Sequence, residues 1–346
     1  MSGLLQQLLN CDCTITNAFI FTALAVGVTK LVFVALSFGT IILESYILPG
    51  VNFSKYGAKK GNWALITGAS DGIGKEYAFQ LAQRGFNIVL VSRTQSKLEL
   101  VASEIETKYK KETKIVAFDA TTDAPENYEK LSKAVEGLSL TILINNVGQS
   151  HSIPVPFLET SEDELTNIVK LNNIVTLKIT KLIAPLIVEN AKKQKGVRGL
   201  ILTMGSFSGL VPTPYLAVYS GSKAFLQNWS SAIAGELKPQ GVDVELVISY
   251  LVTSAMSKIK YTSFTIPNPK QFVKATLKNV GRRVGAQERF ATITPYPSHA
   301  LMHWAIETFL GVYSKTVNQV NLNMHASIRK RALKKAARLA DEKKKS

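Results

Sequence analysis

The chain has 346 residues, a length that suits one α/β domain of about 250–270 residues with a tail at each end. Hydrophobic residues make up 46% of it, enough for a full core and for membrane contact, and the formal net charge is +16. Nine lysines and arginines, against two acidic residues, fall within residues 329–345. On a chain with a membrane segment, such a tail favours anionic lipid or solvent over nucleic acid, so no nucleic-acid partner is predicted. The only cysteines, Cys11 and Cys13, are too close to close a loop and lack partners for zinc, so no disulfide framework is predicted.

The first predicted element is an apolar segment, Ala18–Leu48, interrupted by Lys30 and Glu44. A helix that crosses a bilayer needs about 20 apolar residues, so one tilted span fits if Lys30 snorkels to an interface. A hairpin anchor and a buried core helix are the alternatives. No lysine or arginine precedes the segment, which argues against a cleaved signal peptide. The basic flank at residues 55–60 predicts that the rest of the chain faces the cytosol.

From Asn62 onward, short apolar runs alternate with helical patterns. The runs that predict strands are Trp63–Thr67, Asn87–Ser92, Lys114–Asp119, Leu140–Asn145, Gly199–Met204, Val242–Ile248 and Phe290–Thr294. The patterns that predict helices are Gly72–Arg84, Gln95–Lys110, Pro125–Gly137, Glu162–Asn190 and Ala217–Leu237. Uninterrupted apolar strands between helices indicate a parallel sheet covered on both faces, the Rossmann-type doubly wound α/β fold. Ligands of such a fold bind at the carboxyl ends of the strands.

The turn after the first strand, Thr67–Gly74 (TGASDGIG), consists mostly of small residues. Small residues let backbone N–H groups approach a phosphate at the start of the following helix, so the turn predicts a dinucleotide site. Arg93 follows the second strand, where an NAD site usually has an acidic residue, and this favours NADP(H) unless the arginine is merely solvated. The predicted cofactor contacts at the carboxyl ends of the first four strands are Gly68, Ser70, Asp71, Gly72, Ile73, Gly74, Arg93, Asp119, Asn146 and Gly148.

Tyr219 and Lys223 are four residues apart, which places them on one face of a helix, one turn apart. Reduction of a carbonyl needs a proton at the oxygen, and tyrosine, with a pKa near ~10, is slow in that role unless a neighbouring cation lowers its pKa. Tyr219 and Lys223 are also predicted to contact the cofactor, and Lys223 can bind its ribose hydroxyls. Ser206, just past the fifth strand, is placed to bond a substrate carbonyl. Asn172 is a candidate for holding a water in a proton relay, or else a polar helix residue that bonds to backbone.

In this order, TGASDGIG, NNVG, Ser206 and YSGSK resemble the short-chain dehydrogenase/reductase family over about residues 61–294. The resemblance implies Ser206, Tyr219 and Lys223 as the catalytic triad, with Asn172 as a fourth member. Within the family, the whole chain is similar to fungal reductases of very-long-chain 3-oxoacyl-CoA, through its membrane segment and residues 52–57, 146–151, 203–207 and 249–254. The last stretch lacks the family's usual Pro-Gly after the sixth strand. Val252 and Ser254 are still expected at the nicotinamide end of the cofactor.

The resemblance implies an enzyme of the endoplasmic reticulum membrane, facing the cytosol, that uses NADPH to reduce a long 3-oxoacyl-CoA in fatty-acid elongation, beside other elongation enzymes. A reductase of steroid or sphingoid ketones and a membrane scaffold without turnover are the alternatives. The expected acyl groove involves the loop 250–269 and the apolar helix 301–310. The candidates for binding the CoA phosphates are Lys258, Lys260, Arg282 and Arg283.

Four segments are predicted: a membrane anchor (1–50), a reductase domain (51–294), an apolar helix in contact with membrane or substrate (295–328) and a basic cytosolic tail (329–346). The final lysines of the tail resemble a dilysine retrieval signal. Three residues with helical spacing, His299, His303 and Glu307, permit a metal site, but their apolar surroundings favour a packed helix and no metal is predicted. His151 is expected to structure its loop rather than to catalyse.

Overall fold

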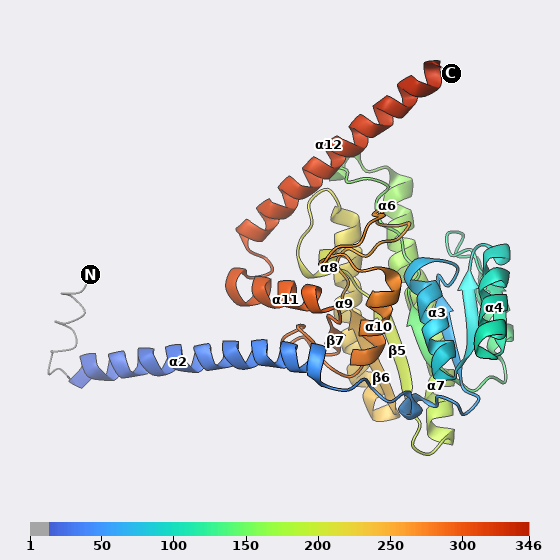
Figure 1. Ribbon diagram of the computed structural model, residues 1–346, viewed down its shortest axis with the longest axis horizontal. Coiled ribbons are helices and arrows are strands. Elements are labelled where there is room, and N and C mark those ends of the chain that lie inside the picture. The colour runs from blue at the N-terminus through green and yellow to red at the C-terminus, as the bar shows by residue number, and fades with distance from the viewer. Residues whose placement is uncertain (1–13, 346) are drawn as a thin grey trace.

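The structure is a computed structural model that describes residues 14–345; Cys11, Cys13 and Ser346 lie outside the described residues. A seven-stranded parallel sheet of order β3-β2-β1-β4-β5-β6-β7 forms its centre, with helices on both faces (Figure 1). The strands are β1 (Trp63–Thr67), β2 (Asn87–Ser92), β3 (Thr113–Ala117), β4 (Leu140–Asn145), β5 (Gly199–Met204), β6 (Val242–Val247) and β7 (Thr292–Ile293). The predicted doubly wound fold is therefore confirmed. The strand order reverses between β1 and β4, where such folds bind their ligands.

Alternation along each strand divides the core between the two faces of the sheet. Ala64 and Ile66 of β1 pack with α3 (Gly72–Arg84), α4 (Gln95–Tyr109) and α10 (Pro269–Asn279). Trp63 and Leu65 pack on the other face with α5 (Pro125–Val135), α7 (Val175–Lys193) and α9 (Ala217–Leu237). The shorter elements are η2 (Phe53–Tyr56), η3 (Phe157–Glu159), α8 (Phe207–Leu210) and η5 (Lys238–Gln240).

Two of the differences between the predicted elements and the structure bear on the site. The third strand ends at Ala117 rather than Asp119, because the Asp119 carboxylate accepts a hydrogen bond from the Thr121 backbone N–H at 2.9 Å and turns the chain. The single helix predicted over Glu162–Asn190 is divided into α6 (Glu162–Val169), a π-helix η4 (Lys170–Ile174) and α7. This division changes which side chains point toward the site.

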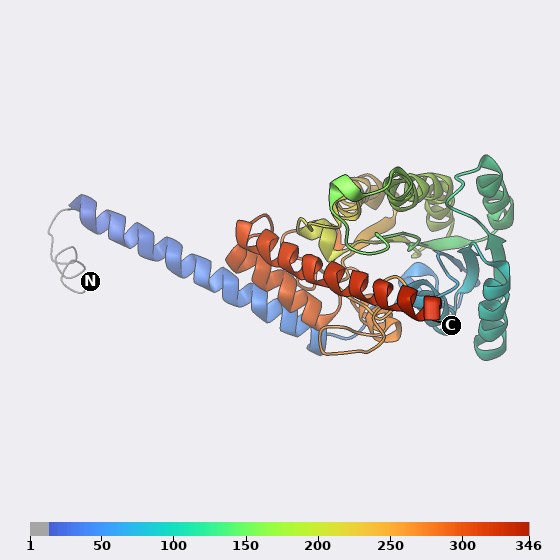
Figure 2. The same cartoon turned by 90° about the horizontal axis from the view of Figure 1, so that it is seen from above.

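The apolar N-terminal segment forms one continuous helix, α2 (Thr14–Ile42), that runs into a π-helix, η1 (Leu43–Ile47), and projects from the body (Figures 1 and 2). It is long and apolar enough to cross a membrane, and none of its most apolar stretch is buried, so the buried core helix is the wrong alternative. Its last turns pack on the body, where Ile41 is buried and the Trp304 indole N–H donates to Ser37 Oγ at 2.9 Å. The other helical stretch of sufficient length, Glu162–Lys193, is half buried and belongs to the core.

The helices of the C-terminal segment are separated at Gly311, and the predicted boundary at residue 328 falls inside a helix. α11 (Pro297–Ala305) and η6 (Ile306–Leu310) come before the glycine, and α12 (Lys315–Lys345) follows it. The predicted basic tail is therefore the continuation of a helix that contacts the body, where Arg329 donates to the Pro154 carbonyl at 2.9 Å. The side chains of the final lysines, on which the dilysine prediction depends, lie outside the described residues.

Candidate active site

A cavity of about 520 Å³ opens at the carboxyl ends of the strands around the point of order reversal. Eight of the predicted cofactor residues line it, so these residues from separate sequence motifs lie together in the structure. They are Gly68, Asp71, Gly72, Ile73, Arg93, Asn146, Gly148 and Ser254. Six predicted cofactor residues, namely Ser70, Gly74, Asp119, Tyr219, Lys223 and Val252, are not among the residues that line the cavity.

The glycine turn has the shape that a diphosphate needs. Gly68 and Gly72 have φ values of +66° and +57°, a conformation that side chains disfavour. A Cβ on Gly74 would lie 2.2 Å from the Gly68 carbonyl oxygen, so only glycine lets the first turn of α3 approach the loop this closely. The Asp71 carboxylate caps α3 by accepting from the Gly72 N–H at 2.7 Å. The positive end of α3 therefore faces the cavity and fits a dinucleotide phosphate.

Four of these six residues, namely Ser70, Gly74, Asp119 and Val252, have structural contacts in this structure. Ser70 Oγ lies 2.8 Å from Ser92 Oγ and joins the glycine turn to the end of β2. Asp119 holds its own turn, and its hydrogen bonds with Thr121 lower the pKa of its carboxyl. Val252 is buried in the core on the α3 face of the sheet. Ser70, Asp119 and Val252 therefore shape the cavity from outside its lining. Gly74 permits the close approach of α3 to the Gly68 carbonyl.

Lys223 lies buried on α9. Its ammonium donates to the Met204 carbonyl at 2.7 Å and lies 5.9 Å from the centre of the Tyr219 ring. Burial lowers the pKa of Lys223 to about 8. Burial also raises the pKa of the Tyr219 phenol, and a hydrogen bond with Ser206 opposes part of that rise. That the Lys223 ammonium lowers the Tyr219 pKa during the reaction stays a prediction.

Ser206 is placed beside Tyr219 by the short helix α8. Its Oγ accepts from the Ser208 N–H at 3.2 Å, which starts the helix directly after β5. Ser220 Oγ in turn donates to the Ser208 carbonyl at 2.5 Å and joins α8 to α9. This role of Ser220 was not predicted, although the residue lies inside the YSGSK motif.

The π-helix η4 presents Asn172 to the site, fully buried. Its Oδ1 accepts from the Gln149 N–H at 2.7 Å, and its Nδ2 donates to the Gln149 carbonyl at 3.0 Å and to Ser222 Oγ at 2.8 Å. The neighbouring Asn173 donates to the Ser222 carbonyl at 2.8 Å. Asn172 thus has the backbone-bonding geometry given as its alternative, and it fixes the loop after β4 against α9. The contacts of Gln149, Asn173 and Ser222 were not predicted from the sequence, because they depend on how the π-helix and the loop after β4 pack against α9.

The histidines have structural contacts. His151 Nδ1 lies 3.2 Å from Glu164 Oε2, and the same carboxylate accepts from the Ser152 N–H, so this residue structures its loop as expected. His299 accepts from the Tyr250 N–H at 3.3 Å, and His303 lies 2.7 Å from Thr294 Oγ1. Among residues 14–345, no group of three potential metal-binding side chains comes together.

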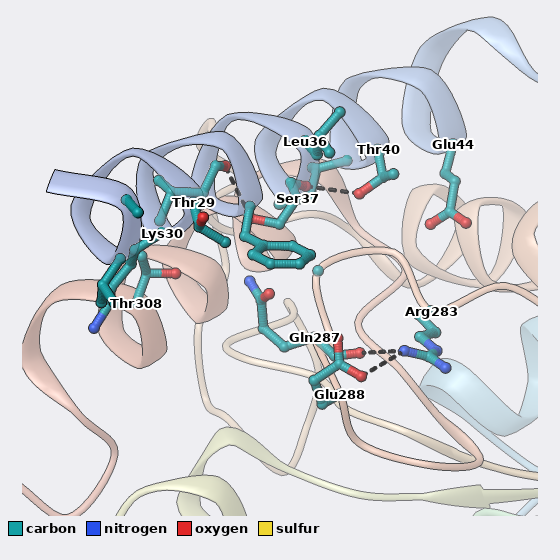
Figure 3. A pocket seen from close by; sticks show the side chains of 16 residues that line it. Thr29, Lys30, Leu36, Ser37, Thr40, Glu44, Arg283, Gln287, Glu288 and Thr308 are labelled. Carbon is teal, nitrogen blue, oxygen red and sulfur yellow. Dashed lines mark hydrogen bonds and ion pairs between the residues drawn. The ribbon is translucent and has the colours of Figure 1, made fainter. Parts of the chain in front are cut away.

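The four basic candidates for the CoA phosphates are separated. Lys258 lines the nucleotide cavity and donates to the Ser152 carbonyl at 2.7 Å. Arg282 instead donates to the Pro49 carbonyl just after the anchor helix, and Arg283 lines a different cavity beside α2 (Figure 3). These two arginines belong to the junction of the anchor with the body and not to the nucleotide cavity.

The fold and the site define a dinucleotide-dependent oxidoreductase, and the comparisons agree. The family model described as short chain dehydrogenase matches residues 62–263, so the chain belongs to the short-chain dehydrogenase family. It is 68% identical to a very-long-chain 3-oxoacyl-CoA reductase of Scheffersomyces stipitis over 93% of both chains. It is also 67% identical to the protein of that name from Candida albicans, over 94% of both chains, and 56% identical to that of Kluyveromyces lactis, over 98% of this chain and 99% of the relative.

The solved structures support the same fold. A short-chain dehydrogenase of Sphingobium yanoikuyae in complex with NADPH is similar with a TM-score of 0.57 and 26% identity, over 68% of this chain and 87% of that one. A 7beta-hydroxysteroid dehydrogenase has a TM-score of 0.64 at 21% identity, over 80% of this chain and 99% of that one, a likeness that concerns the fold alone.

Proposed function

We propose that the chain reduces very-long-chain 3-oxoacyl-CoA to 3-hydroxyacyl-CoA with NADPH, as a step of fatty-acid elongation at the endoplasmic reticulum. The observation that carries the proposal is the 68% identity, over nearly the whole of both chains, to a reductase of that name. A site with Ser206, Tyr219 and Lys223 together supports it, since a scaffold without turnover has no need of this set.

The residues that would hold NADPH follow from the cavity. The turn at Gly68–Gly74 and the start of α3 receive the diphosphate, and the exposed Arg93 at the cavity wall receives the 2′-phosphate. NADPH, when bound, supplies the hydride. Tyr219 gives its phenolic proton to the carbonyl oxygen of the substrate, while the Ser206 hydroxyl donates a hydrogen bond to that oxygen. Lys223, held by the Met204 carbonyl, places its charge beside both the phenol and the ribose.

The proposed substrate explains why a reductase would be anchored in a membrane. Burial of each methylene is worth about 0.8 kcal/mol, so a very long acyl chain stays in lipid or in an apolar groove while the CoA stays in water. An enzyme held at the membrane meets that substrate where it is most concentrated. We also propose that the body faces the cytosol, as the basic flank after α2 favours, and works beside the other elongation enzymes.

The test compares NADPH oxidation with 3-oxoacyl-CoA, steroid and sphingoid ketones in one membrane preparation, with Tyr219→Phe as the matched inactive control. Activity should be highest with the long 3-oxoacyl-CoA and absent in the variant. A steroid or sphingoid ketone with a higher kcat/KM than every 3-oxoacyl-CoA tried would overturn the substrate assignment. Equal rates in the variant would overturn the role of Tyr219.

A further inference from the structure

The turn between η6 and α12 carries exposed apolar side chains at the end of the body from which α2 projects (Figures 1 and 2). Phe309, Leu310 and Tyr313 are 66%, 50% and 78% exposed. Gly311, with φ +79°, reverses the chain between the two helices, so these side chains lie at the tip of a helical hairpin. A cluster of this kind calls for a covering surface, because water is a poor solvent for it.

The length of α2 indicates what that surface is. Contacts of α2 with the core of the body start near Val34 and continue through Ser37 and Ile41. The part of the helix before them, Thr14–Phe33, is about 20 residues and about 30 Å long, which is the thickness of the hydrocarbon core of a bilayer. A membrane crossed by this part would reach the body where α2 enters it.

The tip lies at that same level. Lys30 and Thr308 line the same end of a groove of about 830 Å³ between α2 and the body, while Glu44 and Arg283 line the other end (Figure 3). Phe309 directly follows Thr308, so the tip lies near the end of the groove that Lys30 lines. Lys30 at this end can snorkel to lipid phosphates, which accounts for a lysine in an otherwise apolar helix.

The aromatic residues beside the tip fit a membrane interface. The Trp304 ring packs 5.1 Å from Phe38 of α2 and 5.3 Å from Phe309. Tyr313, at the start of the return to α12, is followed by the exposed Lys315. Tryptophan and tyrosine concentrate at the boundary between hydrocarbon and head groups, and lysine reaches the phosphates there.

We propose that the η6–α12 turn inserts into the surface of the bilayer that α2 crosses, with phospholipid as its partner, so that the body is held at two points. Phe309, Leu310 and Tyr313 enter the acyl region, and the groove beside Lys30 opens to the acyl chains of the same lipids. The inference rests on the membrane anchoring proposed above and not on the reductase activity.

The test adds one tryptophan at the tip, Phe309→Trp, to the full-length chain in bilayers that contain phosphatidylcholine with brominated acyl chains. The matched control is Leu100→Trp, because Leu100 is 67% exposed on α4, at the opposite end of the body (Figure 1). Both variants keep the three native tryptophans, and because Trp304 packs beside position 309, quenching of each variant is expressed relative to its own emission in bilayers without bromine. The added emission should be quenched at position 309 and retained at position 100. Equal quenching, or none, at both positions would overturn the proposal.

A second pair of variants keeps the inference testable if the added ring disturbs the tip. Leu310→Glu placed in the Phe309→Trp chain should reduce the quenching, since a charge opposes insertion while α2 still holds the protein in the membrane. Leu100→Glu in the same background should leave the quenching unchanged. If Leu310→Glu also leaves it unchanged in a chain with native circular dichroism, the turn does not insert.

Discussion

The buried carboxyl group of Glu245 predicts a stability that depends on pH. This residue lies on β6, where its Oε1 accepts from the Gly281 N–H at 2.5 Å, while Oε2 is buried without a hydrogen-bond partner. Burial raises the pKa of Glu245 from 4.5 to about 8; the Gly281 hydrogen bond opposes the rise and the nearby Asp243 carboxylate adds to it. The folded chain therefore keeps a proton on this group at neutral pH that the unfolded chain has lost.

The sign and size of the effect follow from proton linkage. Because the folded state binds the extra proton, the stability contributed by this group is complete below pH 4.5 and falls as the pH rises toward about 8. Each pH unit in that window corresponds to about 1.4 kcal/mol, so the loss between about pH 5.5 and 7.5 is at most about 3 kcal/mol. Glu245→Gln keeps the shape and hydrogen-bonding capacity of the neutral acid and removes the titration.

Thermal unfolding of the full-length chain in one detergent, at pH values from about 5.5 to 7.5, measures how stability changes with pH between the unfolded and folded pKa values of Glu245. The native chain should lose stability as the pH rises, and Glu245→Gln should lose much less and be the more stable chain at the upper end. Glu129→Gln is the control, because it removes an exposed carboxylate of α5. Parallel pH profiles for the native chain and Glu245→Gln would refute the reasoning.

Three further changes test the nucleotide site and the catalytic residues. Tyr219→Phe should abolish turnover but keep NADPH binding, as measured by fluorescence titration, because only the proton donor is removed; substantial turnover by the folded variant would contradict the assignment. Arg93→Asp should reduce the preference for NADPH over NADH by about one to two orders of magnitude, at about 1.4 kcal/mol per tenfold, and an unchanged preference would mean that another residue binds the 2′-phosphate. Gly74→Ala, whose Cβ would lie 2.2 Å from the Gly68 carbonyl oxygen, should weaken NADPH binding about tenfold or more. Gly235→Ala on α9, where nothing lies within 4 Å of the added carbon, should instead be neutral or stabilising by about 0.5–1 kcal/mol.

The strands were predictable because each is a short apolar run between a turn and a helix. β1, β2, β4 and β5 have the predicted bounds, since the same residues that form the core set their length. β3 was less accurate because one side-chain hydrogen bond, from the Thr121 N–H to Asp119, ends the strand two residues early. The sequence did not reveal that basic residues 329–345 continue a helix, because their composition is typical of a solvated tail.

The positions of site residues were predictable where a sequence motif contains them. They were less predictable where an irregularity of the fold sets which way a side chain points. The sequence identified Tyr219 and Lys223 through their helical spacing, and the structure places both on α9. It did not reveal the π-helix that turns Asn172 and Asn173 inward together, since the extra residue of such a turn leaves no composition signal. Nor did it reveal that burial raises the Tyr219 pKa, a property of the surrounding packing.

The packing of the anchor against the body limits how this protein can be made soluble for crystallography or kinetics. Removal of residues 1–50 would delete Ile41 from the core, the Ser37 partner of the Trp304 indole, and the Glu44 carboxylate that accepts from the Val284 N–H at 2.8 Å. Such a truncated chain would expose Trp304 and lose stability for reasons unrelated to the membrane. A chain that starts near Val34, with polar substitutions on the exposed side of the helix alone, keeps these contacts and is the better form to express.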